Sequence, residues 1–164
     1  MERSTKVQSP AAVAALSIVT LGVYACVWYY RVNREMRDYG RASGDEALAA
    51  SKPVRSLLAW VPGGWIVVPL VVSFARATQR VARCERLARM EPNGTGSLIV
   101  LMIVACATGL ASAFAPGTTA AVLVVIEIVC WLTVMAAVQR RLNAIWQRVV
   151  VIDHAAPERA SAAA

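Results

Sequence analysis

The sequence predicts an all-α integral membrane protein, and three features support this: composition, four apolar stretches and the placement of charge. Of its 164 residues, 58% are hydrophobic and only 16% are charged. Soluble domains carry about a quarter charged residues, so this chain has too little polar sequence to enclose apolar helices in a soluble core. The composition disfavours a soluble nuclease, a disordered regulator and a secreted disulfide scaffold.

Four stretches are apolar enough to enter a bilayer. They cover about 11–30, 57–74, 98–114 and 120–138. A helix of about 20 residues crosses a hydrocarbon core of about 30 Å. The second stretch is broken by Pro-Gly-Gly at 62–64, and the first, more weakly, by Thr-Leu-Gly at 20–22. We expect a single helical membrane domain over 1–154 and a disordered tail over 155–164.

The basic residues lie outside the apolar stretches. All seventeen, which contribute to a net charge of +7, fall in four blocks. The blocks contain two residues before position 11, six in 31–55, five in 76–89 and four from 140 onward. Basic residues that flank membrane segments stay in the cytoplasm and contact anionic headgroups. We therefore expect a plasma-membrane protein that contacts anionic lipids and does not bind nucleic acid.

This distribution of charge leaves two topologies open. If all four stretches span from a cytoplasmic N-terminus, the block in 31–55 lies outside, against the positive-inside rule. If the first two stretches are re-entrant hairpins, every block is cytoplasmic and only the turn at 115–119 faces outward. The second topology requires that the broken backbone be buried in protein or face water. Both alternatives place the two termini in the cytoplasm.

Charged segments beside the apolar stretches predict amphipathic helices at the cytoplasmic interface. One covers 76–90, where continuation of the preceding membrane helix is an equal alternative, and the other covers 142–149. Glu85 and Arg89 have the spacing of an i,i+4 ion pair. Capping-box spacing at 43–46 also predicts a short helix within about 45–50.

A motif occupies the first stretch and the residues that follow it. It comprises Thr20, Leu21, Gly22 and Tyr24, then Trp28, then Asn33, Arg34 and Glu35. Over about residues 9–35 the chain resembles domain of unknown function 4234, a family of small bacterial multi-pass membrane proteins, and it departs from the family pattern at 25–27. The resemblance implies a bacterial multi-pass membrane protein and supplies no activity.

Glu127 is the candidate polar site within the membrane, because it alone interrupts the fourth stretch. A charge at the centre of a spanning helix costs roughly 2.5–3.5 kcal/mol on insertion scales, so such a group is protonated, paired or faces a cavity. The functional interpretation is a proton or cation relay. The structural interpretation, which we favour, is a neutral acid hydrogen-bonded across helices to a hydroxyl such as that of Thr108 or Ser112.

No residue pattern predicts catalysis, a cofactor or a metal site. The cysteines Cys26, Cys84, Cys106 and Cys130 lack metal-ligand spacing and are expected to stay reduced, as small apolar side chains.

The predicted function is therefore non-enzymatic. We expect a structural, accessory or scaffold role at the cytoplasmic face, including that of a wedge that shapes the bilayer. Expected partners are anionic lipids and other membrane proteins or further copies of the chain. The alternative is a small transporter or channel subunit that uses Glu127. The two are discriminated by ion or proton flux through Glu127→Gln protein in vesicles.

Overall fold

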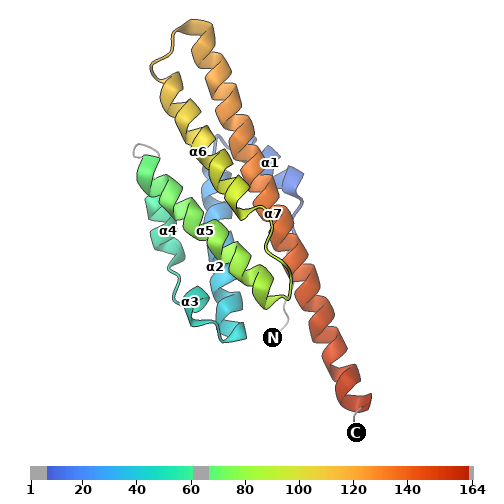
Figure 1. Ribbon diagram of the computed structural model, residues 1–164. Helices are drawn as coiled ribbons and strands as arrows, with labels where there is room; N and C mark the ends of the chain where they lie inside the picture. Colours follow the sequence, from blue (N-terminus) through green and yellow to red (C-terminus); the bar gives the residue numbers. More distant parts are fainter. Residues whose placement is uncertain (1–6, 61–66, 163–164) are drawn as a thin grey trace.

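The computed structural model describes residues 7–60 and 67–162, with side chains for 7–59 and 68–150, and every regular element in this part is helical. The helices are α1 (Pro10–Val19), α2 (Val23–Ser43), α3 (Glu46–Ala49), α4 (Pro53–Trp60), α5 (Val67–Leu87), α6 (Thr95–Ser112) and α7 (Gly117–Ala162). The predicted all-α class is confirmed. Figure 1 shows α6 and α7 as a long antiparallel hairpin, with the other helices packed around part of its length.

Helices α6 and α7 are long and apolar enough to cross a membrane. The qualifying segments are Thr95–Ser112 and Gly117–Val150, and only 22% of the most apolar window of each is buried. A core helix of a soluble protein would be mostly buried, whereas these two helices expose large apolar side chains. Between Glu91 and Arg140, the sole charged residue is Glu127. These features are typical of helices that contact lipid.

The first predicted stretch is divided between two helices, α1 and α2. The chain turns at 20–22, where Leu21 has φ 49° and Gly22 has φ 88°. Gln8, just before α1, bonds to Asn143 on α7, and Trp28 in α2 bonds to Gln139, one turn away on the same helix. Residues before α1 and within α2 therefore contact adjacent turns of α7, on either side of the turn at 20–22. The helices α1 and α2 thus form an antiparallel hairpin (Figure 1). A single helix over 11–30 is therefore wrong, and the break lies where the sequence places it.

The second predicted stretch is likewise divided, between α4 and α5. Its expected break at 62–64 lies outside the described residues. Figure 1 shows α4 and α5 antiparallel beside α2, with α5 descending along α7. The ring centroids of Phe74 on α5 and Trp131 on α7 lie 6.3 Å apart, and Glu85 pairs with Arg141 farther along both helices.

The two expected interfacial helices are continuations of longer helices. Helix α5 continues through 76–87, as the alternative interpretation has it, and α7 continues through 142–149, so a separate helix there is wrong. The predicted short helix near 45–50 is confirmed as α3. Its cap is Asp45, whose carboxylate accepts a hydrogen bond from the Leu48 amide at 2.9 Å. Composition predicts disorder from 155 onward, and this stays a prediction; the α7 backbone is helical through Ala162.

The buried core lies around the half of α7 that follows Glu127. Its largest fully buried side chains include Tyr29 and Met36 from α2, Val81 from α5, and Leu142 and Ile145 from α7. We call this packed part of the bundle the wide half: α1–α5 together with the segments of α6 and α7 beside them. We call the remaining α6–α7 tip, residues 110–126, the narrow half.

Candidate functional site

The most extensive polar network among the described residues joins α2, α4 and α5. Asn33 is fully buried, donates to the Tyr29 carbonyl at 2.8 Å and accepts from Arg80 Nη1 at 2.6 Å. Arg80 also donates to Ser56 Oγ at 3.2 Å, and the Tyr29 hydroxyl lies 2.8 Å from Ser73 Oγ. Tyr29 and Asn33 are four residues apart and Ser73 and Arg80 seven apart, so each pair shares one helix face. The network holds three helices together.

A second polar line runs along α7. Trp28 Nε1 donates to Gln139 Oε1 at 2.7 Å, and Gln139 Nε2 donates to Asn143 Oδ1 at 2.9 Å. Asn143 then donates to the Gln8 carbonyl at 2.7 Å and accepts from its amide at 3.3 Å. Gln8, just before α1, and Trp28, near the start of α2, are thereby fixed to adjacent turns of α7.

A buried ion pair connects α5 to α7. Arg141 donates two hydrogen bonds to Glu85, at 2.7 and 2.6 Å, and a third to Thr95 Oγ1 at 3.1 Å. The side chain of Arg141 is only 14% exposed and that of Glu85 only 5%. The expected pairing of Glu85 with Arg89 is therefore wrong: α5 ends at Leu87, and Arg89 has a left-handed φ of 57°.

A more exposed pair joins α3 to α5. Arg83 Nε donates to Asp45 at 2.7 Å, and the Arg83 side chain is half exposed. The Arg83 guanidinium, followed by the Leu48 amide, holds the pKa of Asp45 below its ordinary value. Nearby, burial raises the pKa of the Cys84 thiol to about 12, so this thiol is neutral at physiological pH.

The residues of the motif lie in three places: the turn between α1 and α2, the buried networks, and the surface of α2. Thr20, Leu21 and Gly22 form the turn between α1 and α2, and Thr20 Oγ1 accepts the Tyr24 amide at 2.9 Å. A Cβ on Gly22 would meet nothing within 4 Å, so its positive φ, not lack of space, favours glycine there.

The other motif residues are buried or on the surface. Trp28 and Asn33 belong to the two buried networks described above. Arg34 and Glu35 lie at the surface of α2, with Arg34 3.8 Å from Asp38 and Glu35 3.5 Å from Arg31. The motif therefore builds a hairpin and its packing, and the structure does not gather its members into one site.

Glu127 lines a cavity of about 1030 Å³ at the boundary of the wide and narrow halves. The cavity lies where the α1–α2 turn and the start of α5 meet α6 and α7. Its lining includes Leu21, Leu70, Cys106, Gly109, Glu127 and Trp131. The carboxyl group of Glu127 packs directly against α6, because a Cβ built on Gly109 would lie 2.7 Å from the carboxyl carbon.

The expected hydrogen bond from Glu127 to Thr108 or Ser112 is absent. Thr108 Oγ1 donates to its own helix at the Val104 or Ala105 carbonyl, each at 3.0 Å, and Ser112 Oγ donates to the Gly109 carbonyl at 2.7 Å. Serine and threonine hydroxyls within helices commonly donate to a backbone carbonyl of the preceding turn in this way. Glu127 faces the cavity instead.

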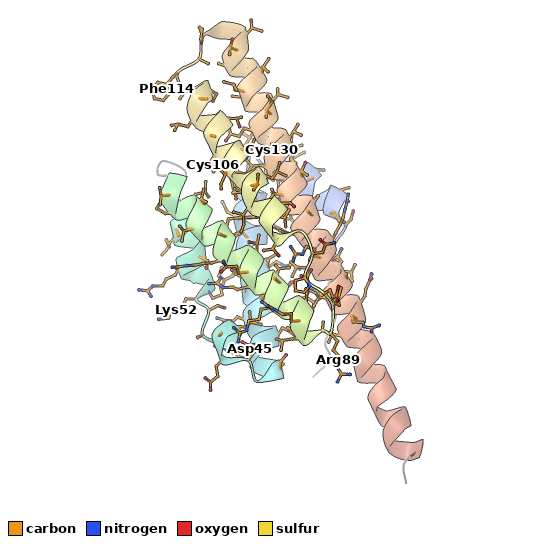
Figure 2. The ribbon with its side chains drawn as sticks, in the orientation of Figure 1. Asp45, Lys52, Arg89, Cys106, Phe114 and Cys130 are labelled. Carbon is orange, nitrogen blue, oxygen red and sulfur yellow. The ribbon has the colours of Figure 1, made fainter. Side chains whose placement is uncertain are left out.

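The four cysteines are all free. Figure 2 shows Cys106 and Cys130 near the middle of the α6–α7 hairpin, with Phe114 at its tip and Asp45, Lys52 and Arg89 toward the opposite end. Within the described residues, no group of three His, Cys, Asp or Glu side chains is placed to hold a metal ion.

Sequence reasoning missed the polar residues that hold the wide half together, chiefly Ser56, Ser73, Arg80, Gln139 and Asn143. One signal was present: Gln139 and Asn143 are two amides spaced i,i+4 directly after an apolar run. Such a pair lies on one helix face. Its partners, Trp28 and Gln8, are more than 100 residues away, and no local pattern identifies them.

Comparison with known proteins gives a family and no described activity. Neither the curated proteins nor the solved structures contain a match to this chain. A family model does match, over residues 8–144, which cover the motif, both hairpins, the cavity and the buried networks. The chain therefore belongs to the family described as domain of unknown function (DUF4234).

Proposed function

We propose that this protein is a non-enzymatic, wedge-shaped scaffold of the bacterial plasma membrane. In this proposal α6 and α7 span the bilayer, and the α1–α2 and α4–α5 hairpins enter and leave it on the cytoplasmic side. The observation that carries the proposal is the unequal cross-section of the bundle along the α6–α7 hairpin. The tip of that hairpin extends beyond all the other helices (Figure 1).

The contacts along α7 support a hairpin depth of about half a bilayer. Trp131, Gln139 and Arg141 each contact another helix of the wide half, and Glu127 shares its cavity with the α1–α2 turn. At a rise of 1.5 Å per residue, Glu127 lies about 15 Å from the start of α7 at Gly117. A hydrocarbon core is about 30 Å thick, so the α1–α2 turn and the first turns of α5, which line the same cavity as Glu127, reach about the midplane.

The charges support the orientation. In the described part of the chain, the arginines and Lys52 lie on α2, α4 and α5, in the loops beside α3 and α5, or on α7 from Arg140 onward. The narrow half carries none, and its turn at 115–119 is uncharged. A bundle with this distribution places its wide half in the cytoplasmic leaflet. The same arginines would contact anionic headgroups there.

The physical consequence is a difference in area between the two leaflets. Among the described helices, α1, α2, α4 and α5 displace lipid in the cytoplasmic leaflet together with α6 and α7, whereas α6 and α7 alone displace it in the other leaflet. A molecule of this shape is most stable where the leaflet that holds its wide half is convex. Such a protein bends or stabilises curved membrane by its shape, without catalysis.

The proposal is tested by measuring how vesicle curvature selects orientation. Full-length protein with its four cysteines replaced by alanine carries one new cysteine, either Ser43→Cys in the wide half or Thr118→Cys at the tip. Each is reconstituted into small and large vesicles and treated with a membrane-impermeant thiol reagent. We expect Ser43→Cys labelling to be higher in small vesicles and Thr118→Cys labelling to be lower. Equal labelling at both sizes would refute the wedge.

The topology itself is tested in intact cells. Labelling of Thr118→Cys without Ser43→Cys supports the re-entrant arrangement. Labelling of both positions identifies four spans and removes the basis of the wedge.

A variant of the α1–α2 turn links the shape to the effect. Gly22→Val places a β-branched residue at φ 88° and should open the hairpin. The same substitution at Gly96 is the control, since that glycine has no positive φ and open space around it. Only Gly22→Val should reduce the dependence of orientation on curvature.

The cavity gives a specific reason to keep the transporter alternative. An acidic side chain that faces a cavity within a membrane is typical of transport pathways. Ion or proton flux into vesicles, with Glu127→Gln as the variant, tests this alternative. Flux that is present in wild type and lost in Glu127→Gln supports transport through Glu127. The same flux in both proteins excludes a transport role for Glu127.

A further inference from the structure

We propose that the cavity beside Glu127 binds a lipid-soluble alcohol, a molecule with an apolar body and a hydroxyl that hydrogen-bonds to the Glu127 carboxyl group. This inference rests on the membrane embedding proposed above and does not depend on the wedge. It assigns a ligand to the cavity that Glu127 lines at the boundary of the two halves.

The size and lining of the cavity specify the apolar body. A volume of about 1030 Å³ lies at the upper end of the range of small-molecule sites. Most of the lining consists of leucine, isoleucine, alanine and similar carbon-rich side chains. Ser17 also lines the cavity, but its hydroxyl donates to the Val13 carbonyl at 2.8 Å and is buried. The ligand must therefore be largely hydrocarbon.

Glu127 specifies the polar group of the ligand, because within the described residues its carboxyl has no hydrogen-bond partner. The nearest hydroxyls on α6 already donate to their own backbone, as described above. An unpaired polar group in an apolar medium costs free energy. A ligand that supplies the missing bond gains this free energy on binding.

A hydroxyl suits this carboxyl better than other polar groups do. It donates to a carboxylate and accepts from a carboxylic acid, so it pairs with either protonation state. An ammonium or phosphate group would bring a charge to the middle of the bilayer, and an alkane would leave Glu127 unpaired. The absence of a side chain at Gly109 lets the carboxyl remain at the cavity wall beside α6.

The experiment compares two photoreactive probes on full-length protein in vesicles of uncharged phospholipid. One probe is a hexadecanol analogue with a diazirine on its chain, and the other is the matching alkane without the hydroxyl. Mass spectrometry locates the labelled residues. The variants are Glu127→Leu, Glu127→Gln and Ala113→Trp, which fills the cavity from an exposed lining position. Val125→Leu, on the exposed side of α7, is the control.

We expect the alcohol to label the cavity lining about three- to tenfold more than the alkane, the factor that one hydrogen bond provides. Glu127→Leu should lower alcohol labelling to the alkane level, Glu127→Gln should retain it, and Ala113→Trp should reduce both probes. Equal labelling by the two probes, or alcohol labelling unchanged in Glu127→Leu, would overturn the inference. These outcomes are independent of the orientation assay, so failure of one proposal does not imply failure of the other.

Discussion

The two halves of the bundle differ in the contacts that hold their helices together in an apolar environment. The wide half is held by buried polar contacts, among them Trp28 with Gln139 and Glu85 with Arg141. The narrow half contains no such contact in the described chain and exposes Phe114 and Val125 at 83% and 59%. The hydrophobic effect gives little net attraction between helices that are surrounded by lipid, whereas hydrogen bonds and ion pairs between helices do hold them together. The wide half is therefore the specified part, and the narrow half is held mainly by its turn and close backbone packing.

The largest change in the free energy of unfolding is expected from breaking the Glu85–Arg141 ion pair of the wide half. Glu85→Leu leaves the mostly buried Arg141 guanidinium without its carboxylate, and such a loss costs roughly 3–5 kcal/mol. The free energy of unfolding, measured in detergent by denaturant titration, should fall by about that amount. The double variant Glu85→Leu/Arg141→Met should recover most of the loss, since an apolar pair of similar volume replaces the ions. A loss below 1 kcal/mol in the single variant would mean that water reaches the pair.

A smaller effect is expected from the hydrogen bond between α2 and α7. Trp28→Phe removes the donor to Gln139 and leaves a buried acceptor, at a cost of about 1–3 kcal/mol. Trp28→Phe/Gln139→Leu removes both partners and should be closer to wild type than the single variant. If the two are equally unstable, the lost volume of the indole ring explains the change and the hydrogen bond does not.

Local signals in the sequence predicted the all-helical class, the break in the first stretch and the short helix near 45–50, but they also predicted a separate helix at 142–149 that is part of α7. The turn at Gly22 and the short helix near 45–50 depend on a few consecutive residues, so composition and spacing sufficed. The capping box at 43–46 does not form, because Ser43 ends α2 and Asp45 caps α3. The partners of Glu85 and Trp28, and the cavity that Glu127 faces, were not predictable in this way, because each depends on which helix faces lie together. Glu85 has a plausible partner in Arg89, but the end of α5 removes it, and the packing of α7 supplies Arg141 instead.

A still smaller effect concerns the exposed pair of the wide half. The lowered pKa of Asp45 means that its contribution to stability is complete above its ordinary pKa, about 3.9, and is lost as pH falls through the lowered value. The unfolding temperature of wild type should therefore decrease below about pH 4 more than that of Asp45→Asn, which keeps the cap and loses the charge. Parallel pH profiles for the two proteins would contradict a stabilising Asp45–Arg83 pair.

The smallest effect is expected in the narrow half, at Phe114. Its side chain is 83% exposed, so Phe114→Leu removes few contacts within the chain, and surface changes of this kind stay within about 0.5 kcal/mol. Denaturant titration in detergent should give the same free energy of unfolding as wild type. A loss above 1 kcal/mol would show that this surface packs against something. If the loss also depended on protein concentration, that partner would be a second copy of the chain, and the narrow half would then be specified by association between molecules.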